Sequence, residues 1–473
     1  MYDKLTHYTT DMVKSKPMGH IRNLYKKWMS LELLYAFIAF IWGIILVFLI
    51  PPFQTPDEPA HYYRAVGISN GHYICKEGNR LEIPLENSYF VNAMDTYTIL
   101  SYPDRKFSIE NIKKYQDSGN KESKLVHMPL CYSLSIPHHI IAVPLKLGTF
   151  INFNLLQSFY LARLTNLIMA IIVTTIAMHI IPFGKRIIFT LGILPMTIHQ
   201  YASLNYDAFF IPMIFLFIAY TLYLYKKDHP LTMKNKVILL CLSIFGTIVK
   251  LGYQPLLIIP SILLFRKKEK IKKTVLFLIL VWVINIILLV MQQKLLVNYD
   301  DYQKGVDPSE QIHSILTHPF TYLITIIRTL YYRLGYYVQS YLGYFGWLDY
   351  KLKAIYYYLI PIGSIVFIWL DKKRVTLPFK VRLIFILAFF ITTLCIFTSM
   401  YVVNTIVDNN IIIGVQGRYL IGISLAAALG IHYLPDNKII KKYRHIISAS
   451  LLLLLLIIIV QTIRATYIRY YAY

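Results

Sequence analysis

Long apolar runs are the feature that most constrains this chain, because a helix of about 17–25 apolar residues matches the thickness of a bilayer. Eleven runs are apolar enough to cross a membrane as whole or partly buried helices, and they lie near residues 32–51, 156–182, 187–202, 206–225, 236–250, 253–265, 274–293, 354–370, 383–403, 411–434 and 445–463. The chain is 56% hydrophobic and only 15% charged. We therefore predict an all-α polytopic membrane protein in which residues 1–473 form a single transmembrane domain.

The distribution of basic residues predicts the orientation. A net charge of +24 would suggest a nucleic-acid partner in a soluble domain, whereas in a polytopic protein Lys and Arg collect in short cytoplasmic loops. If residues 1–31 are cytoplasmic, strict alternation places 27 of the 48 Lys and Arg in six short cytoplasmic segments. We therefore expect a cytoplasmic N-terminus, two long exofacial loops at 52–155 and 294–353, and no nucleic-acid partner.

One further apolar run, residues 128–148, tests this topology. If it crossed the membrane, every later loop would change sides and the basic segment 266–273 would lie outside, against the charge rule. We therefore expect helices that lie in or dip into the outer interface and are broken at Pro137 and Pro144.

A charged stretch, "PDEPAHYYRA" at 56–65, follows the first apolar run directly. Asp57 is a good N-cap and a proline is tolerated in a first helical turn, so a short helix is expected to begin here. On such a helix Asp57, His61 and Arg64 share one face at the water–lipid boundary, while Glu58 points elsewhere. A plainer alternative stays open, in which Asp57 only caps the helix and the two basic side chains face lipid headgroups.

Several motifs carry a resemblance to known families. The stretch "PDEPAHYYRA", the later "HMPL" at 127–130 and "FYLARLTNLI" at 159–168 resemble the GT-C superfamily of polyprenyl-phosphate-sugar-dependent glycosyltransferases. More closely, "PDEPAH", "LNYDAF", "GYFGWLDYKL" and "VQGRYLIGI" resemble bacterial membrane proteins grouped as the domain of unknown function 2142 family. The resemblance implies an acidic pair after the first span, interfacial helices in the first loop and an arginine near the outer start of the second span.

The resemblance also implies which residues act. An acceptor hydroxyl needs a base, and Asp57 is our first choice with Glu58 as the second. A phosphate leaving group needs cations, and Arg163, Lys250 and Arg418 are the basic residues within or at the rim of a span. For Lys250 and Arg418, snorkelling toward headgroups is the alternative. The full set expected to bind substrate or phosphate is His61, Arg64, Arg163, Asp207, Lys250, Trp347, Asp349, Arg418 and Tyr419.

Three acidic or aromatic positions leave alternatives open. Asp207 takes the place of the second exofacial acid of GT-C enzymes, which some members use for metal binding, and it could instead pair with a cation. Trp347 and Asp349 offer a sugar a stacking face and a hydroxyl acceptor, or they cap the following helix. No metal-ligand spacing is readable, so a divalent metal stays an open question, as does a disulfide between Cys75 and Cys131.

These expectations combine into one function. We expect a multi-pass glycosyltransferase of the bacterial plasma membrane, with its active site on the extracytoplasmic face, that moves a sugar from a polyprenyl phosphate such as undecaprenyl phosphate to a cell-envelope glycan or lipid. One alternative is a glycan polymerase or ligase that uses a polyprenyl-diphosphate donor. Another is a flippase or transporter of lipid-linked glycans, for which polar groups at the membrane midplane and broken helices in paired repeats are typical.

Overall fold

The computed structural model describes residues 30–74, 80–102, 104–117, 119–127, 136–227, 229–247, 250–266, 271–294, 304–371, 377–431 and 442–472. These residues are mostly α-helical, with two short antiparallel strand pairs. The prediction of a helical membrane protein is therefore confirmed in its broad form. Cys75 and Cys131 both lie outside the described residues.

Six described helices are long and apolar enough to cross a membrane: α2 (Leu31–Leu49), α8 (Leu155–Ile180), α11 (Asp207–Lys226), α13 (Ile271–Lys294), α17 (Phe379–Asn404) and α20 (Arg444–Tyr470). Two shorter apolar helices are η1 (Gln254–Phe265), which is a 3₁₀ helix, and α16 (Tyr356–Trp369). The remaining predicted spans contain α12 (Met233–Thr247) and, within 411–434, η2 (Gly417–Leu420) and α18 (Ser424–Ile431). The count of eleven membrane crossings stays a prediction.

The predicted span at 187–202 is divided into two short helices. α9 (Lys185–Gly192) ends before a short break, and α10 (Pro195–Tyr201) begins at Pro195. A proline fits the first turn of a helix because it has no amide hydrogen to donate, but it cannot continue the turn before it. The break leaves α10 as a short helix whose seven residues are all buried.

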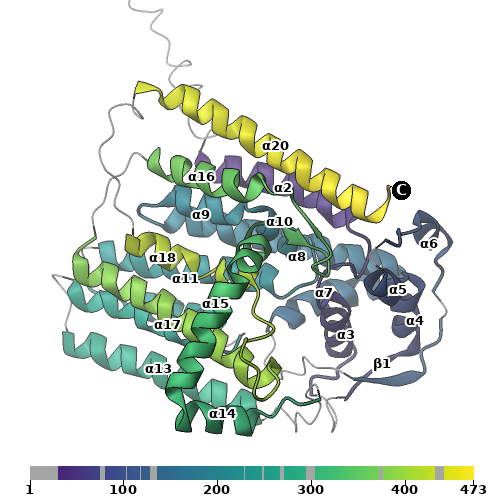
Figure 1. Ribbon diagram of the computed structural model, residues 1–473, viewed down its shortest axis with the longest axis horizontal. Coiled ribbons are helices and arrows are strands. Elements are labelled where there is room, and N and C mark those ends of the chain that lie inside the picture. The colour runs from purple at the N-terminus through teal and green to yellow at the C-terminus, as the bar shows by residue number, and fades with distance from the viewer. Residues whose placement is uncertain are drawn as a thin grey trace, which may run out of the picture.

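The long helices α2, α13, α17 and α20 run in similar directions across the view of Figure 1. The elements of the first loop gather at the right-hand end, beside the end of α20, and α15 crosses steeply. Contacts between helix ends agree with this arrangement. After the C-terminal end of α20, the Tyr471 hydroxyl donates to the Leu49 carbonyl at the end of α2. At the N-terminal end of α20, Arg444 donates to the Leu370 carbonyl, which directly follows α16. Helix ends that strict alternation assigns to one side therefore lie together, and which side is cytoplasmic stays a prediction.

The centre of the protein is the packing of α8 between α2 and α11. Fully buried small residues of α8, such as Ala162 and Ala170, let neighbouring helices approach closely. α11 is the most enclosed of the six long helices, with 83% of its apolar window buried. This core fixes the start of α8 and the start of α11, which carry Arg163 and Asp207.

The first loop folds into α3 (Glu58–Ser69), β1 (Arg80–Pro84), α4 (Leu85–Ala93), α5 (Thr96–Ser101), α6 (Ile109–Lys114), β2 (Ser123–His127) and α7 (Ile136–Phe150). β1 pairs with β2 in antiparallel register, and this strand pair was not predicted. The predicted break at Pro144 is wrong, because α7 runs through this proline, whereas the helix begins at Ile136, so the predicted break at Pro137 is not contradicted. Pro137 lies in the first turn, where no hydrogen bond is lost, and α7 packs along α3 and α8, which holds the turn around Pro144.

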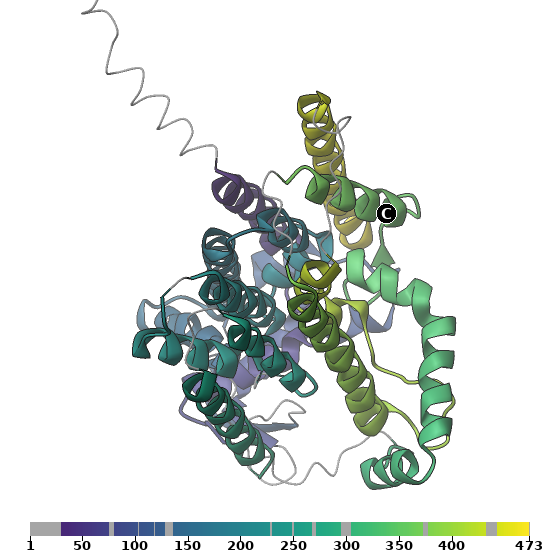
Figure 2. The same ribbon diagram turned by 90° about the vertical axis from the view of Figure 1, so that its left-hand side faces the viewer.

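The second long loop also contains regular structure. It holds α14 (Pro308–Thr317), α15 (Pro319–Leu342), β3 (Tyr344–Phe345) and β4 (Tyr350–Lys351). α15 packs against η2, and the β3–β4 hairpin follows it directly. Figure 2 shows α15 as a long helix along one side of the molecule. This loop therefore brings the "GYFGWLDYKL" motif toward the first loop and the end of α20.

Candidate functional site

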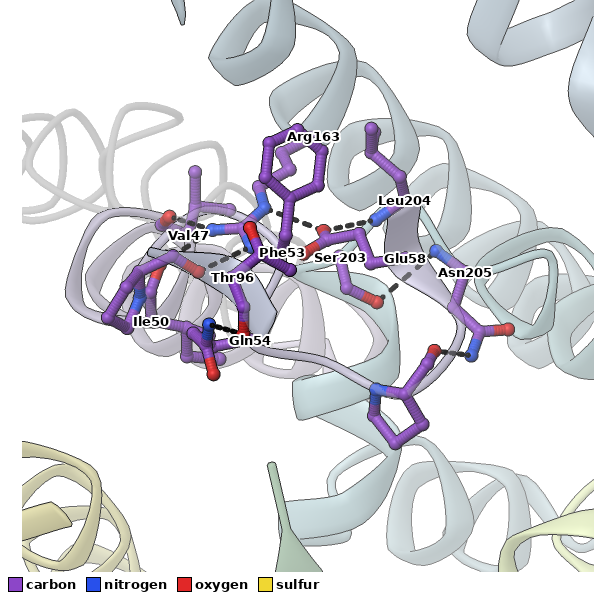
Figure 3. Close-up of polar contacts among 12 residues, drawn as sticks. Val47, Ile50, Phe53, Gln54, Glu58, Thr96, Arg163, Ser203, Leu204 and Asn205 are labelled. Carbon is purple, nitrogen blue, oxygen red and sulfur yellow. Dashed lines mark hydrogen bonds and ion pairs between the residues drawn. The ribbon is translucent and has the colours of Figure 1, made fainter. Parts of the chain in front are cut away.

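The connection between α2 and α3 is fixed by Arg163 of α8 (Figure 3). Its Nε and Nη2 atoms donate to the two carboxylate oxygens of Glu58 at 2.9 and 2.6 Å. Its remaining N–H groups donate at 2.7–3.1 Å to the backbone carbonyls of Val47, Ile50 and Pro51. A guanidinium has five N–H donors, and here all five are used inside the protein. Both side chains of the ion pair are fully buried.

This network also joins "PDEPAH" to "LNYDAF". The Glu58 carboxylate accepts a hydrogen bond from the Leu204 amide at 3.0 Å, and the Asn205 side chain donates to the Pro56 carbonyl at 3.5 Å. Arg163 has no N–H left for a phosphate, and neither Glu58 oxygen faces solvent. We therefore correct two expectations: these residues hold the site in place, and the geometry does not support Arg163 as a phosphate ligand or Glu58 as a base.

Asp57 takes a different position from its neighbour. Its backbone lies in the left-handed region, at φ 63°, and no backbone N–H of α3 donates a capping hydrogen bond to its side chain. Asp57 therefore occupies the N-cap position of α3, as predicted, but its side chain does not cap the helix. Aspartate tolerates this conformation better than most residues, and such strained positions cluster at functional sites. The side chain is 55% exposed, and its Oδ2 lies 3.5 Å from Nη2 of Arg418.

Arg418 lies at the start of η2, and its side chain is only 3% exposed. Its Nη1 donates to Oε1 of Gln200 at 3.2 Å, and among the described residues its Nε has no partner. Gly417 explains how the guanidinium reaches this depth, because a Cβ at that position would lie 2.0 Å from the Tyr337 carbonyl oxygen of α15. η2 can therefore approach α15 closely only with glycine there.

Lys250 and Asp207 form a second charged pair. The Lys250 Nζ contacts Oδ1 of Asp207, and both side chains are buried. The same Nζ lies 4.5 Å from the ring centre of Tyr206 and 4.7 Å from that of Tyr419, within the range of cation–π attraction. Lys250 therefore points into the protein and does not snorkel. Tyr419, which was expected in the site, lies between the two cations. Its ring centre is also 5.6 Å from Cζ of Arg418.

Two histidines adjoin this cluster. The Nδ1 of His61 and the Nε2 of His138 are 2.8 Å apart, so one ring donates to the other. The His61 ring also meets the edge of the Tyr206 ring, at 4.7 Å between centres. Burial lowers the pKa of His61 to about 3, and the charges of Arg418 and Lys250 act in the same direction. Burial also holds the pKa of His138 well below its usual value. The pair is therefore neutral at ordinary pH.

Three residues of the expected set lie away from the Asp57–Arg418 pair. Arg64 donates to the His72 and Tyr73 carbonyls at 3.2 and 2.6 Å and holds the chain after α3. The indole of Trp347 donates to the Phe53 carbonyl at 3.1 Å. Asp349 accepts from Arg469 of α20, and burial raises the pKa of its carboxyl, partly offset by that arginine. These contacts fix the first loop, the hairpin and α20 to one another.

The sequence did not single out Gln200 and Tyr253, which contact Arg418 and Tyr419, or His199, which directly precedes Gln200 in α10. Gln200 orients Arg418, and the Tyr253 hydroxyl donates to the Tyr419 carbonyl at 2.7 Å. His199 is buried beside Phe345, at 5.3 Å between ring centres. The one available signal was the pair of polar residues "HQ" at 199–200 inside an apolar run.

No group of three or more His, Cys, Asp or Glu side chains within the described ranges is placed to hold a metal ion. The two acids nearest the centre, Asp57 and Asp207, each face a cation instead. A divalent metal stays an open question, and the arrangement is better suited to binding an anion beside an accessible carboxylate.

Comparison with known proteins gives one match. The model of a family described as "Predicted membrane protein (DUF2142)" matches residues 40–427. No curated protein and no solved structure matches the chain. The matched segment includes both charged pairs, Asp57 with Arg418 and Asp207 with Lys250.

Proposed function

The chain belongs to the DUF2142 family of predicted membrane proteins, and from this premise we propose that it is a membrane glycosyltransferase. Its donor is a sugar linked to a polyprenyl phosphate, and its acceptor is an exofacial glycan or lipid of the bacterial cell envelope. The site opens on the extracytoplasmic face of the plasma membrane. The GT-C resemblance of the motifs supports the class of reaction, and the charged cluster supports the roles of individual residues.

One observation carries the proposal: an accessible carboxylate lies beside a buried guanidinium. Asp57 is half exposed and Arg418 is almost fully buried, with 3.5 Å between their nearest oxygen and nitrogen. A buried arginine at the edge of a membrane is costly unless an anion accompanies it. Asp57 meets this need only loosely, since the contact is long and the Nε of Arg418 has no partner among the described residues. A phosphate oxygen is a better match for the guanidinium.

The reaction follows from these two groups. The acceptor hydroxyl attacks the anomeric carbon, and its proton passes to the Asp57 carboxylate as the new glycosidic bond forms. The bond between the anomeric carbon and the phosphate oxygen breaks, and its electron pair stays on the polyprenyl phosphate. Arg418 stabilises the negative charge that develops on that oxygen. No general acid is needed, because a phosphate is already a good leaving group.

The second charged pair has a supporting role. Lys250 adds positive charge near Arg418, and Asp207 and the rings of Tyr206 and Tyr419 hold its ammonium group in place. Because Asp207 offsets the Lys250 charge, Arg418 remains the principal ligand of the phosphate. Tyr419 follows Arg418 directly and packs between the two cations, so it sets their separation.

The test is Asp57→Asn, measured as transfer of a labelled hexose from polyprenyl-phosphate-linked donors to envelope acceptors by the full-length protein in proteoliposomes. Asparagine keeps the size and tolerates the left-handed conformation but cannot take a proton. We expect transfer to fall by about 10²-fold or more, with an unchanged melting temperature. Near-normal transfer by a folded Asp57→Asn protein would contradict the assignment of Asp57 as base.

Asp95→Asn is the matched control. Asp95 also has a left-handed backbone, at φ 55°, precedes a short first-loop helix without a side-chain cap, and pairs with an arginine, Arg105, at 3.2 Å. It therefore reproduces the backbone setting of Asp57 away from the Arg418 cluster. Transfer by Asp95→Asn should equal that of the wild type.

One observation favours a second candidate function, the transport of lipid-linked glycans. The break between α9 and α10 leaves polar residues on a short buried helix, and discontinuous helices are typical of transporter binding sites. Acceptor-independent movement of a labelled lipid-linked glycan across proteoliposomes, unaffected by Asp57→Asn, would support transport instead. A polymerase or ligase would be indicated by transfer from polyprenyl-diphosphate donors only.

A further inference from the structure

We propose that His199 binds a hydroxyl of the donor sugar and is a specificity-determining residue; this inference rests on the proposed function. His199 lies on α10, directly before Gln200, whose side chain accepts a hydrogen bond from Arg418. A group bound by Arg418 is therefore within reach of the same short helix.

Both ring nitrogens of His199 lack a hydrogen-bond partner among the residues that the structure describes. The residue is only 1% exposed, so bulk water does not reach the ring. Buried polar atoms are normally hydrogen-bonded, and an exception calls for an explanation such as a ligand. The ring is held against Phe345 of the hairpin, at 5.3 Å between centres, so its orientation is fixed by packing alone.

The location supports a ligand site. α10 is one half of a discontinuous helix that packs against α2, α8, α11 and α15. Irregular backbone buried at membrane depth occurs where it lines a cavity or a binding site. His199 directly precedes Gln200, the partner of Arg418, whereas Nδ1 of His61 is hydrogen-bonded to His138 and the His61 ring lies against Tyr206.

The chemistry of the imidazole selects the ligand. A deeply buried imidazole is neutral, so one nitrogen donates and the other accepts. A phosphate oxygen would satisfy only the donor, and an ammonium group would satisfy only the acceptor. A hydroxyl group both donates and accepts, and neighbouring hydroxyls on a sugar ring can serve both nitrogens. With the phosphate on Arg418, His199 is placed to bind the sugar that the phosphate carries.

The test compares two probes on the purified full-length protein in lipid nanodiscs: polyprenyl phosphate without sugar, and polyprenyl phosphate carrying a hexose, across a small panel of hexoses. The wild type should bind one hexose-linked lipid at least about tenfold more tightly than the bare phosphate, a preference that one buried polar contact can supply. His199→Leu should lose that preference and bind bare polyprenyl phosphate within twofold of the wild type. His199→Gln, which keeps a donor and an acceptor, should retain part of it.

Stability without ligand is the second measurement. Leucine removes two unsatisfied polar atoms from a buried position, so His199→Leu should melt at the same temperature as the wild type or higher. His179→Leu is the control. It makes the same substitution at an exposed position near the C-terminal end of α8, and it should leave the affinities for both probes unchanged.

Three results would overturn the inference. If His199→Leu weakens both probes equally, or lowers the melting temperature by several degrees with the hexose preference intact, His199 is structural. If the wild type binds bare polyprenyl phosphate through Arg418 but prefers no hexose, the phosphate site stands and only the role of His199 is lost. If the wild type binds neither probe, the proposed function itself fails, and this inference fails with it.

Discussion

Arg163 and Arg418 are the same residue type near the ends of apolar segments, but their surroundings differ. Arg163 uses all five N–H groups on Glu58 and three backbone carbonyls, whereas Arg418 has one loose ion pair, one hydrogen bond to Gln200 and an Nε without a described partner. A complete set of partners indicates a structural role, and an incomplete set indicates room for a ligand. This difference decides which arginine binds the phosphate.

The first prediction compares Arg163→Lys with Arg418→Lys. An ammonium group cannot reproduce the fork that holds Glu58 and the carbonyls, so Arg163→Lys should lower the free energy of unfolding by about 3 kcal/mol or more. Arg418→Lys should change it by less than about 1 kcal/mol but weaken binding of polyprenyl phosphate about tenfold. Melting temperatures with and without polyprenyl phosphate measure both effects. Equal destabilisation by the two substitutions would make Arg418 a structural partner of Asp57.

The sequence predicted part of this cluster for a physical reason. Asp57, Asp207, Lys250 and Arg418 stand out because charge is costly in or beside an apolar segment. The contacts of Arg163 could not be predicted, since an arginine saturated by carbonyls and one awaiting a ligand have similar local sequences. The N-cap position of Asp57 was predicted, but its missing side-chain cap was not, because local sequence does not report a left-handed φ. His199 was missed because its significance depends on its surroundings in space, where no described residue forms a hydrogen bond with the imidazole.

At the scale of helices and strands, hydropathy predicted the long helices but not where apolar segments break. The runs at 32–51, 156–182 and 206–225 correspond closely to α2, α8 and α11. The run at 187–202 did not reveal the division before Pro195, and the run at 128–148 suggested a break at Pro144 that α7 does not have. A proline interrupts a helix only where surrounding packing does not hold the turn, and that packing comes from distant elements.

The end of α20 provides the second prediction. Arg469 is buried, pairs with Asp349 of the hairpin, and donates to the Arg105 and Ile99 carbonyls of the first loop at 2.9 and 3.2 Å. Arg469→Met keeps much of the apolar stem but leaves a buried carboxylate unpaired, so we expect a loss of about 3 kcal/mol or more in unfolding free energy.

Its control is Arg464→Met, one and a half turns earlier on the exposed side of the same helix, which should change stability by less than about 0.5 kcal/mol. Chemical denaturation of the two variants in matched detergent measures the difference. A replacement of both Arg469 and Asp349 by apolar residues should recover part of the loss, because it removes the unpaired charge. Failure to recover any of it would show that the carbonyl contacts dominate.

At the scale of the whole molecule, the charge rule and the contacts between helix ends support the same pairing of segments. Hydrogen bonds join the end of α20 to the first loop through Lys106 and Phe107. The candidate site is likewise built from the ends of segments that strict alternation assigns to the same face. The basic loops alone predict which face is cytoplasmic. The contacts fix which ends lie together, and the charges predict the side.

The last prediction tests that side with single cysteines in a background where Cys75, Cys131, Cys241 and Cys395 are replaced by serine. Lys113 in α6 and Lys380 in α17 are both exposed, so neither substitution should disturb folding. A membrane-impermeant maleimide applied to intact cells should label Lys113→Cys and spare Lys380→Cys, and both should react after lysis, which shows that each thiol is accessible.

The reverse pattern would invert the orientation and place the Asp57–Arg418 site on the cytoplasmic face. A lipid-linked donor would then have to be used before it crosses the membrane. Labelling of both positions in intact cells would mean that α17 does not separate the two faces, and the charge-based topology would be wrong.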